Sequence, residues 1–355
     1  MTTSSPKTEQ NPFVVYLHEK LPLVEQALTD AQTHPLTDSA SAADLANYLY
    51  SPLARFTASG GKRVRPVLAL LGAEAVGGKA EQALSAAVAI ELFQSAALIH
   101  DDIADEGELR RGEPCLYRTE GIGLAINAGD LALTNVIEIV LNDNSLDEAH
   151  RLNVAQALIE MERHTLEGQA LDLGWVRDGR WDLTTQDYLY MVTSKTAWYT
   201  AASPLYIGAL AAGASKEAAQ GLIEVGLPAG IAFQVQDDLL NLIGDPTSQG
   251  KDFRSDITEG KRTLAVVWAL SHLGSPDREE LITILESSTN DSEQLARAVE
   301  LIEIGGGIAY CQEVAQKNVD KAIQAAESLA HKGLISDTAC KMLQAMADFF
   351  VERAK

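Results

Sequence analysis

Apolar residues recur along this chain at spacings of three and four, the period of an α-helix, and alternating apolar and polar runs are almost absent. The apolar stretches are rich in Ala and Leu, which favour helices. Breakers of Gly, Pro or polar residues separate them, for example at 77–78, 142–145 and 174–182. Helices are therefore predicted over residues 13–31, 40–57, 62–76, 80–104, 120–141, 146–171, 184–211, 215–243, 259–272, 277–286, 291–303, 306–331 and 336–353.

The organisation of these helices predicts an all-α fold, a single large helical bundle. No repeat of solenoid period is present, and no shift in composition marks a linker. The helices at 80–104 and 215–243 are apolar around much of their circumference, which indicates burial. Residues 1–12 are polar and contain no apolar signal sequence, so we expect a solvated, disordered tail followed by one domain over 13–355.

Composition narrows the classes of function. The chain has 355 residues, 46% of them hydrophobic, and a formal net charge of −22, which argues against a nucleic-acid or anionic-membrane partner. No run reaches the roughly 20 clean apolar residues of a membrane span. The three cysteines are far apart and in no metal-ligand spacing, which indicates reduced thiols. A cytoplasmic protein is expected.

The first acidic cluster follows an apolar run. Asp101 and Asp105 are four residues apart and share one helix face, with Asp102 beside them. Carboxylates packed this closely repel one another, and the apolar residues before them make uncompensated charge costly. A bound cation resolves both problems, and hard oxygen ligands favour Mg²⁺, which commonly bridges to substrate phosphate.

A second cluster ends another apolar helix. Asp237, Asp238 and Asn241 follow one another there, and Asp237 and Asn241 share a face. Asn241 offers a carbonyl oxygen but no charge. One such cluster could equally be a solvated helix end with spare acids; two of them, each ending a buried helix, favour a metal site.

Basic residues stand near Gly turns and near these acids, which favours an anion site in so acidic a chain, since Lys binds phosphate as a point charge and Arg as a bidentate fork. Arg63 and Arg262 are interpreted instead as ordinary surface charge. The candidate anion-binding residues are Lys62, Arg65, Arg110, Arg111, Lys195, Lys251 and Lys261.

Acids and bases together suit a diphosphate leaving group, because metal ions, Lys and Arg can neutralise its charge. Ionisation would leave an allylic carbocation, which an apolar channel must shield from water. No nucleophile elbow, phosphate loop or dinucleotide fingerprint is present. His100 is interpreted as a hydrogen-bonded core or supporting residue. Trp175, Trp181 and Trp198 are interpreted as packing residues.

At this point the sequence resembles the trans-type isoprenyl diphosphate synthases, the polyprenyl synthetase family. The resemblance covers about residues 40–355. Within the family, the chain is most similar to a bacterial geranylgeranyl diphosphate synthase. The order and spacing of its motifs are specific, although each alone would be weak. The motifs are GGKRVRP (60–66), LIHDDIADEGELRRGEP (98–114), SKT (194–196), FQVQDD (233–238) and GKDFRSDITEGKRT (250–263).

The resemblance implies a helical homodimer with a central cavity, in which two Asp-rich motifs face each other and hold about three Mg²⁺ ions. It assigns two metals to Asp101 and Asp105 with Asp102 in support, and the third to Asp237 with Asp238 and Asn241 nearby. The family usually has Asp where this chain has Asn241. The substrate residues implied are Arg110, Lys195, Lys251 and Lys261 for the allylic diphosphate, Lys62, Arg65, Arg111 and Gln94 for isopentenyl diphosphate, and Thr196 and Gln234 beside the reacting carbons.

The reaction implied is a head-to-tail condensation by ionisation, attack of the isopentenyl double bond and proton loss to the released diphosphate. Side chains before the first motif set product length in this family. Ala96 and Ala97 are small, and Phe93 lies one turn below as a deeper stop, so geranylgeranyl diphosphate is the expected product. A longer polyprenyl product is the alternative.

Three rival interpretations remain. A terpene cyclase would share the fold and the acidic motifs, but it would not need Lys62, Arg65 and Arg111. A non-catalytic subunit of a heteromeric synthase would be expected to lack aspartates that this chain keeps. A helical scaffold without activity does not account for the density of motifs.

Overall fold

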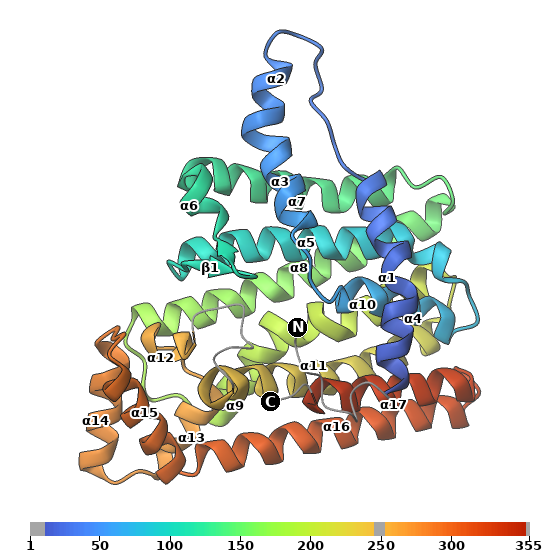
Figure 1. The fold of residues 1–355 in the computed structure, drawn as a ribbon. Coiled ribbons are helices and arrows are strands. Elements are labelled where there is room, and N and C mark those ends of the chain that lie inside the picture. The colour runs from blue at the N-terminus through green and yellow to red at the C-terminus, as the bar shows by residue number, and fades with distance from the viewer. Residues whose placement is uncertain (1–10, 245–252, 353–355) are drawn as a thin grey trace.

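The structure, a computed structural model, describes residues 11–244 and 253–352 and is helical almost throughout these ranges (Figure 1). This confirms the all-α prediction. The helices of the first half are α1 (Pro12–Asp30), α2 (Ala42–Leu45), α3 (Ser51–Ala58), α4 (Val64–Ala75), α5 (Leu84–Ala104), α6 (Leu116–Glu120), α7 (Ile122–Leu141) and α8 (Glu148–Arg177). Those of the second half are α9 (Thr185–Val192), α10 (Ser203–Ala211), α11 (Lys216–Ile243), α12 (Ser255–Thr258), α13 (Leu264–His272), α14 (Ser275–Glu286), α15 (Ser292–Ile304), α16 (Gly307–His331) and α17 (Asp337–Glu352).

Short irregular elements join these helices. A π-helical segment, η2 (Ala46–Tyr50), lies between α2 and α3, and a second, η4 (Thr193–Ala202), lies between α9 and α10. A 3₁₀ turn, η3 (Ala80–Ala83), precedes α5. Two short antiparallel strands, β1 (Leu109–Arg110) and β2 (Glu113–Pro114), form a hairpin directly after α5, with Leu109 opposite Pro114.

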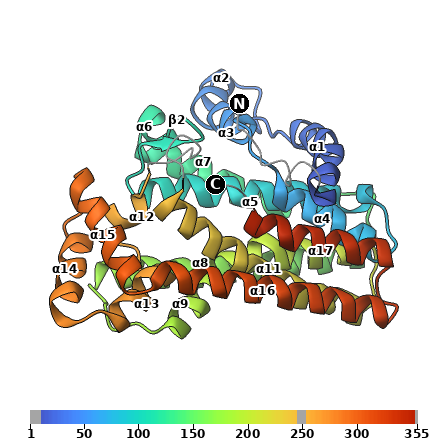
Figure 2. The ribbon, with the colours of Figure 1, turned by 60° about the horizontal axis from the view of Figure 1, so that its bottom comes forward.

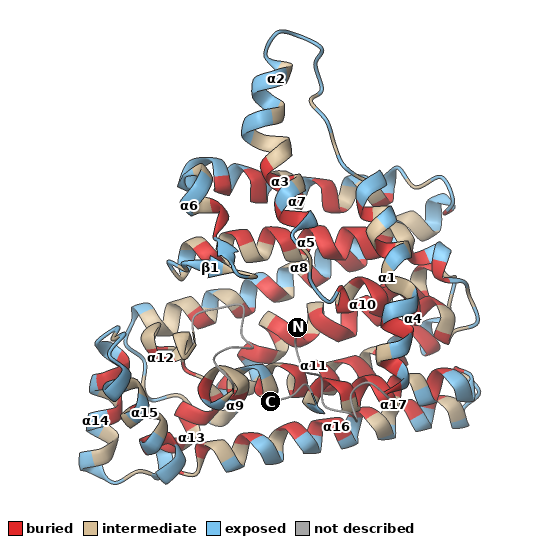
Figure 3. Cartoon of the chain, viewed as in Figure 1, coloured by how far each residue is buried: buried red, intermediate tan, exposed pale blue. Residues whose placement is uncertain are grey.

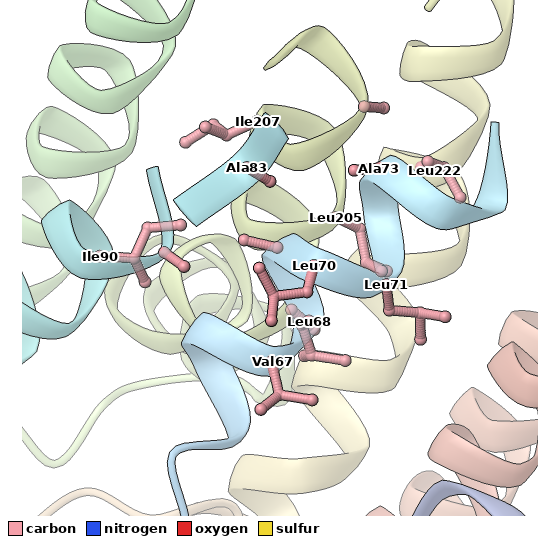
Figure 4. Close-up of a cluster of buried hydrophobic side chains, with 14 of the residues drawn as sticks. Val67, Leu68, Leu70, Leu71, Ala73, Ala83, Ile90, Leu205, Ile207 and Leu222 are labelled. Atoms are coloured by element: carbon pink, nitrogen blue, oxygen red, sulfur yellow. The ribbon is translucent and has the colours of Figure 1, made fainter. Parts of the chain in front are cut away.

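The core lies where α4, α5, α10 and α11 pack together. Apolar side chains of α4 meet α10 and α11, as Leu68 and Leu71 do beside Leu205 and Leu222 (Figure 4). Buried residues concentrate on α5, α10 and α11, whereas α14 and α15 expose much of their surface (Figure 3). The two helices expected to be central, α5 and α11, are therefore the ones that the bundle covers.

Most helices begin and end within two residues of the prediction, and four differences have local causes. The helix expected over 184–211 is interrupted by the π-helical η4. Gly121, with φ at +87°, separates α6 from α7, so the helix expected from 120 starts at Ile122. The expected break at 174–182 begins only after Arg177. The helix expected over 259–272 is α13 alone, because Gly260, with φ at +63°, lies in a turn after α12.

Asn11 belongs to the fold, although the expected tail includes it. Its side chain is buried, accepts from the backbone N–H of Phe13 at 2.8 Å and donates to the carbonyl of Ala345 at 2.9 Å. Pro12 follows at the first position of α1, where its missing N–H is least costly. Residues 1–10 lie outside the described part of the chain.

Three helices are long and apolar enough to cross a membrane by length and composition, namely Ala80–Ala104, Ile122–Leu141 and Lys216–Ile243. Packing accounts for the first and third, which are 67% and 56% buried within the bundle. The second, α7, is only 39% buried and presents Ile122 and Ile126 to solvent. The apolar composition of α7 therefore indicates a face that the monomer leaves uncovered.

Candidate active site

The C-terminal ends of α5 and α11 lie on the same side of the bundle, beside the β1–β2 hairpin and α12 (Figures 1 and 2). The last turn of α5 carries Asp101, Asp102 and Asp105. Asp101 accepts a hydrogen bond from Gln169 Nε2 of α8 at 2.9 Å. Asp102 is buried and is paired with Arg110 of the hairpin, whose Nε donates to Asp102 Oδ1 at 2.8 Å. The hairpin thus folds Arg110 back onto the acidic motif eight residues earlier.

Asp102 retains an unused oxygen. Its Oδ2 is buried and makes no hydrogen bond within the described residues. The thiol of Cys115 lies close by, and burial together with the Asp102 charge raises the pKa of Cys115 to about 12. A buried carboxylate oxygen without a donor is costly, and a bound cation or water would satisfy it.

A buried carboxylate on α8, Asp172, links two lysines from distant parts of the chain. Lys195 Nζ donates to Asp172 Oδ2 at 2.6 Å, and Lys261 Nζ lies 3.4 Å from the same oxygen. Lys261 also donates to Asp105 Oδ1 at 2.7 Å, across 156 residues of sequence. These contacts connect the end of α5 with α8, η4 and the segment after α12.

Close packing of α8 against η4 makes this network possible. A Cβ on Gly168 would lie 2.1 Å from the backbone nitrogen of Lys195, so only glycine fits there. Asp172 follows Gly168 by one helical turn and meets the lysine of the same π-helical segment. Thr196, next to Lys195, is buried. π-Helical segments occur often at functional positions, and this one contains both Lys195 and Thr196.

The charges of the network shift the pKa values of its members. Burial alone would lower the pKa of Lys195, but the negative charges of Asp172 and Asp101 outweigh it, so the pKa is raised. Burial also acts against Lys261, but Asp172 and Asp105 raise its pKa. The pKa of Asp172 is lowered, because Lys195 and Lys261 outweigh the effect of its burial. Burial and the charge of Asp101 raise the pKa of Asp105.

The end of α11 carries the second acidic motif. Asp238 accepts from the Tyr188 hydroxyl at 2.6 Å and from Gln234 Nε2 at 2.7 Å. Burial raises the pKa of Asp238 to about 7, despite these two hydrogen bonds. Asp237, its neighbour, is exposed. Asn241 turns towards α12, with its Nδ2 3.3 Å from Ser255 Oγ and its Oδ1 accepting from the backbone N–H of Asp256 at 3.3 Å.

Electrostatic coupling joins the two acidic motifs. The Asp172 charge contributes to the raised pKa of Asp238, and the Asp101 charge acts in turn on Asp172. Within the described residues, no three Asp, Glu, His or Cys side chains form a ready-made metal cluster. The donor set nevertheless fits Mg²⁺, which is usually bound by one or two carboxylates together with waters and substrate phosphates.

A second basic group is formed by Arg65 at the start of α4, whose partners come from η4 and α5. Arg65 Nη2 donates to the Tyr199 hydroxyl at 2.9 Å and to Thr200 Oγ1 at 2.8 Å, and its guanidinium lies 4.3 Å from the centre of the Tyr199 ring. With its amide oriented to satisfy both neighbours, Gln94 accepts from Arg65 Nη1 at 3.1 Å and donates to Glu91 at 3.2 Å. Gln94 and Arg65 are therefore in contact.

Among the other predicted anion-binding residues, Arg111 acts electrostatically on the same group, since the charges of Glu91 and Arg65 both affect its pKa. Arg111 adopts the left-handed region, with φ at +57°, and donates to Ser59 Oγ at 3.1 Å. Burial lowers the pKa of Arg111, although the charge of Glu91 opposes this. Lys62 is exposed. The last predicted anion-binding residue, Lys251, lies outside the described residues.

The interpretation of Arg63 and Arg262 as surface charge is wrong, because both side chains are buried. Arg63 donates to Glu91 at 2.5 Å, to Glu25 at 2.7 Å and to the carbonyl of Thr57 at 2.6 Å. It thereby fixes the loop between α3 and α4, which carries Lys62 and leads into the first turn of α4, where Arg65 lies. Arg262 stacks on Trp181, with its guanidinium carbon 3.8 Å from the ring centre.

The residues expected to set product length lie on the buried side of α5. Ala96 is fully buried, Ala97 is partly buried, and Phe93 is 2% exposed. Phe93 packs edge-on against Tyr199, with the ring centres 5.8 Å apart. Tyr199 also supports Arg65, so the aromatic pair connects the apolar interior with the second basic group.

Sequence reasoning missed Asp172, Gln169 and Tyr188. Asp172 stands in no acidic run, but it follows Met161, Thr165 and Gly168 at spacings of four, three and four, the period of one helix face. All four residues are buried. The sequence could have indicated Asp172 in one way, because an acidic residue on a helix face that is otherwise buried needs a partner of opposite charge. His100 is half-exposed, with Nε2 3.3 Å from the carbonyl of Ile126, which agrees with a hydrogen-bonded supporting residue but not with a core one.

Comparisons with known proteins agree on one family. The sequence model for polyprenyl synthetase matches residues 46–302. A short chain isoprenyl diphosphate synthase of Methanothermobacter thermautotrophicus is 40% identical over 295 residues, which is 83% of this chain and 87% of that protein. A (2E,6E)-farnesyl diphosphate synthase of Mycobacterium bovis is 35% identical over 82% of this chain and 80% of its own length.

Solved structures match nearly the whole chain. The geranylgeranyl pyrophosphate synthetase of Pyrococcus horikoshii has a TM-score of 0.84 and 31% identity, covering 96% of this chain and 98% of that one. A geranylgeranyl pyrophosphate synthase of Corynebacterium glutamicum, crystallised with isoprenyl diphosphate and magnesium, has a TM-score of 0.84 and 29% identity, covering 97% and 99%.

Proposed function

This chain belongs to the polyprenyl synthetase family, and we propose that it joins isopentenyl diphosphate head to tail to an allylic prenyl diphosphate, with release of diphosphate. The observation that carries the proposal is the network in which Lys195 and Lys261 connect the acidic end of α5 to Asp172. The acidic end of α11 is coupled to the same carboxylate. Carboxylates for a divalent metal and ammonium groups for a diphosphate thus stand side by side.

A divalent metal ion, Mg²⁺ by the chemistry of the oxygen ligands, would neutralise the diphosphate and make it a better leaving group. Asp101 and Asp105 would hold it at α5, with Asp102 in support through its unused Oδ2. Asp237 would hold it at α11, with Asp238 beside it. Asn241 faces the residues of α12, which supports a role in positioning that turn. About three ions per site is the number that the family resemblance implies.

Lys195, Lys261 and Arg110 would bind the allylic diphosphate, with Lys251 as a further candidate. In the free enzyme Asp172, Asp105 and Asp102 hold these three cations in place. The bond between the allylic carbon and the diphosphate oxygen breaks, and its electron pair leaves with diphosphate. Cations fixed before the substrate arrives stabilise that developing charge without reorganisation.

Lys62, Arg65 and Arg111 would bind isopentenyl diphosphate, with Gln94 in contact with Arg65. The terminal carbon of its double bond attacks the allylic carbon, which leaves a tertiary cation at the other carbon of that double bond. A proton then leaves to the released diphosphate, from the carbon between this cation and the carbon that bears the diphosphate of the isopentenyl unit. Thr196 and Gln234 would lie beside the reacting carbons. The buried apolar side of α5 would exclude water from the cation.

We propose geranylgeranyl diphosphate as the main product. Ala96 and Ala97 leave room for the growing chain, and Phe93, fixed by Tyr199, would end it. Relatives of this chain are named for different product lengths, from farnesyl to geranylfarnesyl. A longer polyprenyl product is the second candidate.

The test supplies labelled isopentenyl diphosphate, Mg²⁺ and each allylic starter in turn, and identifies the products by length. A linear C20 diphosphate is the expected result. Cyclic hydrocarbon without elongation would instead identify a cyclase, and turnover only after addition of a second protein would identify a partner subunit of a heteromeric synthase.

We propose that the enzyme is a soluble, cytoplasmic homodimer. Its strongly acidic net charge and the packing of α5 and α11 within the bundle support solubility. Exposed apolar side chains on α7 and α8 support an interface there, for instance Ile126 at 42% and Leu166 at 63% exposure. Sedimentation should give twice the mass of one chain, and the pair of changes Ile126→Glu and Leu166→Glu should give monomers.

A further inference from the structure

A cavity of about 280 Å³ lies at the far end of the bundle from α7, between the α8–α9 loop, α13 and the start of α14. None of the residues proposed for catalysis lines it. Its walls combine three arginines with an apolar floor and two polar residues. The lining residues are Arg180, Trp181, Asp182, Leu183, Arg262, Val267, Leu270, Ser271 and Arg278.

The arginines are unequally neutralised. Arg180 makes a bidentate pair with Asp182, at 2.5 and 3.1 Å, and both side chains are largely exposed. Arg278 donates to the backbone carbonyls of Leu270 and Trp181, at 3.2 and 3.4 Å. Arg262 donates to the carbonyls of Gly260 and Arg180. Neither Arg278 nor Arg262 forms an ion pair with a carboxylate in the part of the chain that the structure describes.

Arg262 makes the site an unusual one for a chain of net charge −22. Arg262 is only 3% exposed, and its guanidinium lies against the Trp181 ring. Burial lowers the pKa of Arg262, and the charges of Glu286 and Asp172 oppose this effect. Glu286 already accepts a hydrogen bond from Trp181 Nε1 at 2.7 Å. A buried charge without a counter-ion is costly, and a guanidinium presents a planar fork of donors that fits phosphate or carboxylate oxygens.

We propose that this cavity binds a small phosphate-bearing anion, of the size of inorganic phosphate or diphosphate. Arg262 and Arg278 supply the positive charge, and Arg180 closes the open side. The volume is just below the range of about 300–1,000 Å³ that is typical of organic-ligand pockets, which favours a small ligand over a large cofactor. Ser271 also lines the cavity, and its hydroxyl donates to the backbone carbonyl of Trp268 at 2.7 Å.

Anion binding here would also stabilise the backbone that presents Lys261. Arg262 follows Lys261 directly and holds the carbonyl of Gly260, which has a φ of +63°. An anion that neutralises Arg262 would lower the cost of keeping this guanidinium buried in the turn. The site is nevertheless separate from the proposed active site, so its binding can be measured without catalysis.

The experiment titrates the full chain by calorimetry, in EDTA, with inorganic phosphate, with diphosphate and with succinate as a carboxylate probe. The variants are Arg278→Ala and, in case that change alters folding, Arg180→Ala, whose side chain is largely exposed. The matched control is Arg177→Ala, a change at an exposed arginine three residues before Arg180 that pairs with Asp178 and does not line the cavity. Lys195→Ala removes anion binding by the active-site lysine.

The proposal predicts that phosphate or diphosphate binds the wild-type chain and the Arg177→Ala variant alike, and that binding at this cavity remains in Lys195→Ala after the contribution of the active-site lysine is lost. Binding should weaken about tenfold in Arg278→Ala, the loss expected for one charged hydrogen-bonding group. The stronger of the two phosphate probes identifies the ligand size. Four results would each overturn the proposal. They are no binding of either phosphate probe to the wild type, wild-type affinity in both Arg278→Ala and Arg180→Ala, loss of all binding in Lys195→Ala, and tighter binding of succinate than of the phosphate probes.

Discussion

Replacing Asp172 with Asn tests whether the network of buried charges holds the free enzyme together. The change preserves the shape of the side chain and removes its negative charge. Lys195 and Lys261 then lose their shared counter-ion, although Lys261 keeps Asp105 at 2.7 Å. The Asp172 side chain is 6% exposed, and those of Lys195 and Lys261 are 25% and 11% exposed, so solvent screens the loss only weakly.

The magnitude follows from these contacts. Breaking a buried ion pair costs about 3–5 kcal/mol. The Asn oxygen can still accept one hydrogen bond, and Asp105 still neutralises Lys261, so we expect the free energy of unfolding to fall by about 2–3 kcal/mol. The folded-state pKa of Asp172 is lowered, because the two lysines outweigh its burial. Its stabilisation is therefore present above an unfolded pKa of about 3.9 and is lost as the pH falls through the folded-state value.

Urea unfolding at one fixed protein concentration measures the difference, at pH 7 and again near pH 3. The two proteins should differ by the full amount at pH 7 and by less at the lower pH. Asp178→Asn, a change at an exposed residue directly after the same helix, is the matched control and should leave stability nearly unchanged. A stability of Asp172→Asn equal to wild type at pH 7 would refute the reasoning.

Three further predictions rest on single side chains. Ala97→Phe should shorten the main product, because an aromatic ring above Phe93 would close the space for the growing chain; product analysis by mass spectrometry with an unchanged length distribution would remove this explanation. Arg63→Ala should lower the free energy of unfolding by about 3–5 kcal/mol, since it leaves Glu91 buried without its partner, whereas Arg177→Ala should be nearly neutral. Glu162→Gln should stabilise the protein, since burial raises the pKa of Glu162 to about 7 and Oε1 has no hydrogen-bond partner among the described residues. The gain in the free energy of unfolding should be absent near pH 4 and reach about 1 kcal/mol by pH 8, after allowance for partial solvent screening. Denaturation curves at several pH values measure it, and a gain that falls as the pH rises would contradict the prediction.

Helix periodicity predicted nearly every helix, because apolar faces and glycine breaks are local properties of the sequence. The interruption of 184–211 was not predictable in this way. The π-helical segment packs closely against α8 at Gly168, and hydrophobic periodicity along the sequence does not reveal such a contact between two helical elements. The same reason hid Asp172, whose partners come from η4 and from the segment after α12.

Charge along the sequence identified the acidic ends of α5 and α11, since clustered carboxylates are visible without a structure. It misjudged Arg63 and Arg262, because the sequence does not reveal which cations the fold encloses. Arg63 comes directly after Lys62, which follows two glycines, so the sequence predicts the same exposure for both cations. In the structure Arg63 adopts the left-handed region, and its side chain donates to Glu91. The roles of the metal-binding and substrate-binding residues stay predictions.

The central claim is that carboxylates from α5 and α11 share divalent ions that bind the allylic diphosphate. The most direct measurement is the affinity for an unreactive allylic diphosphate analogue, by calorimetry with Mg²⁺ and with EDTA, in the wild type, Asp101→Ala and Asp237→Ala. Tight binding should require Mg²⁺, and its Mg²⁺-dependent part should be lost in both variants. Affinity that does not depend on Mg²⁺, or that survives either change, would contradict the account.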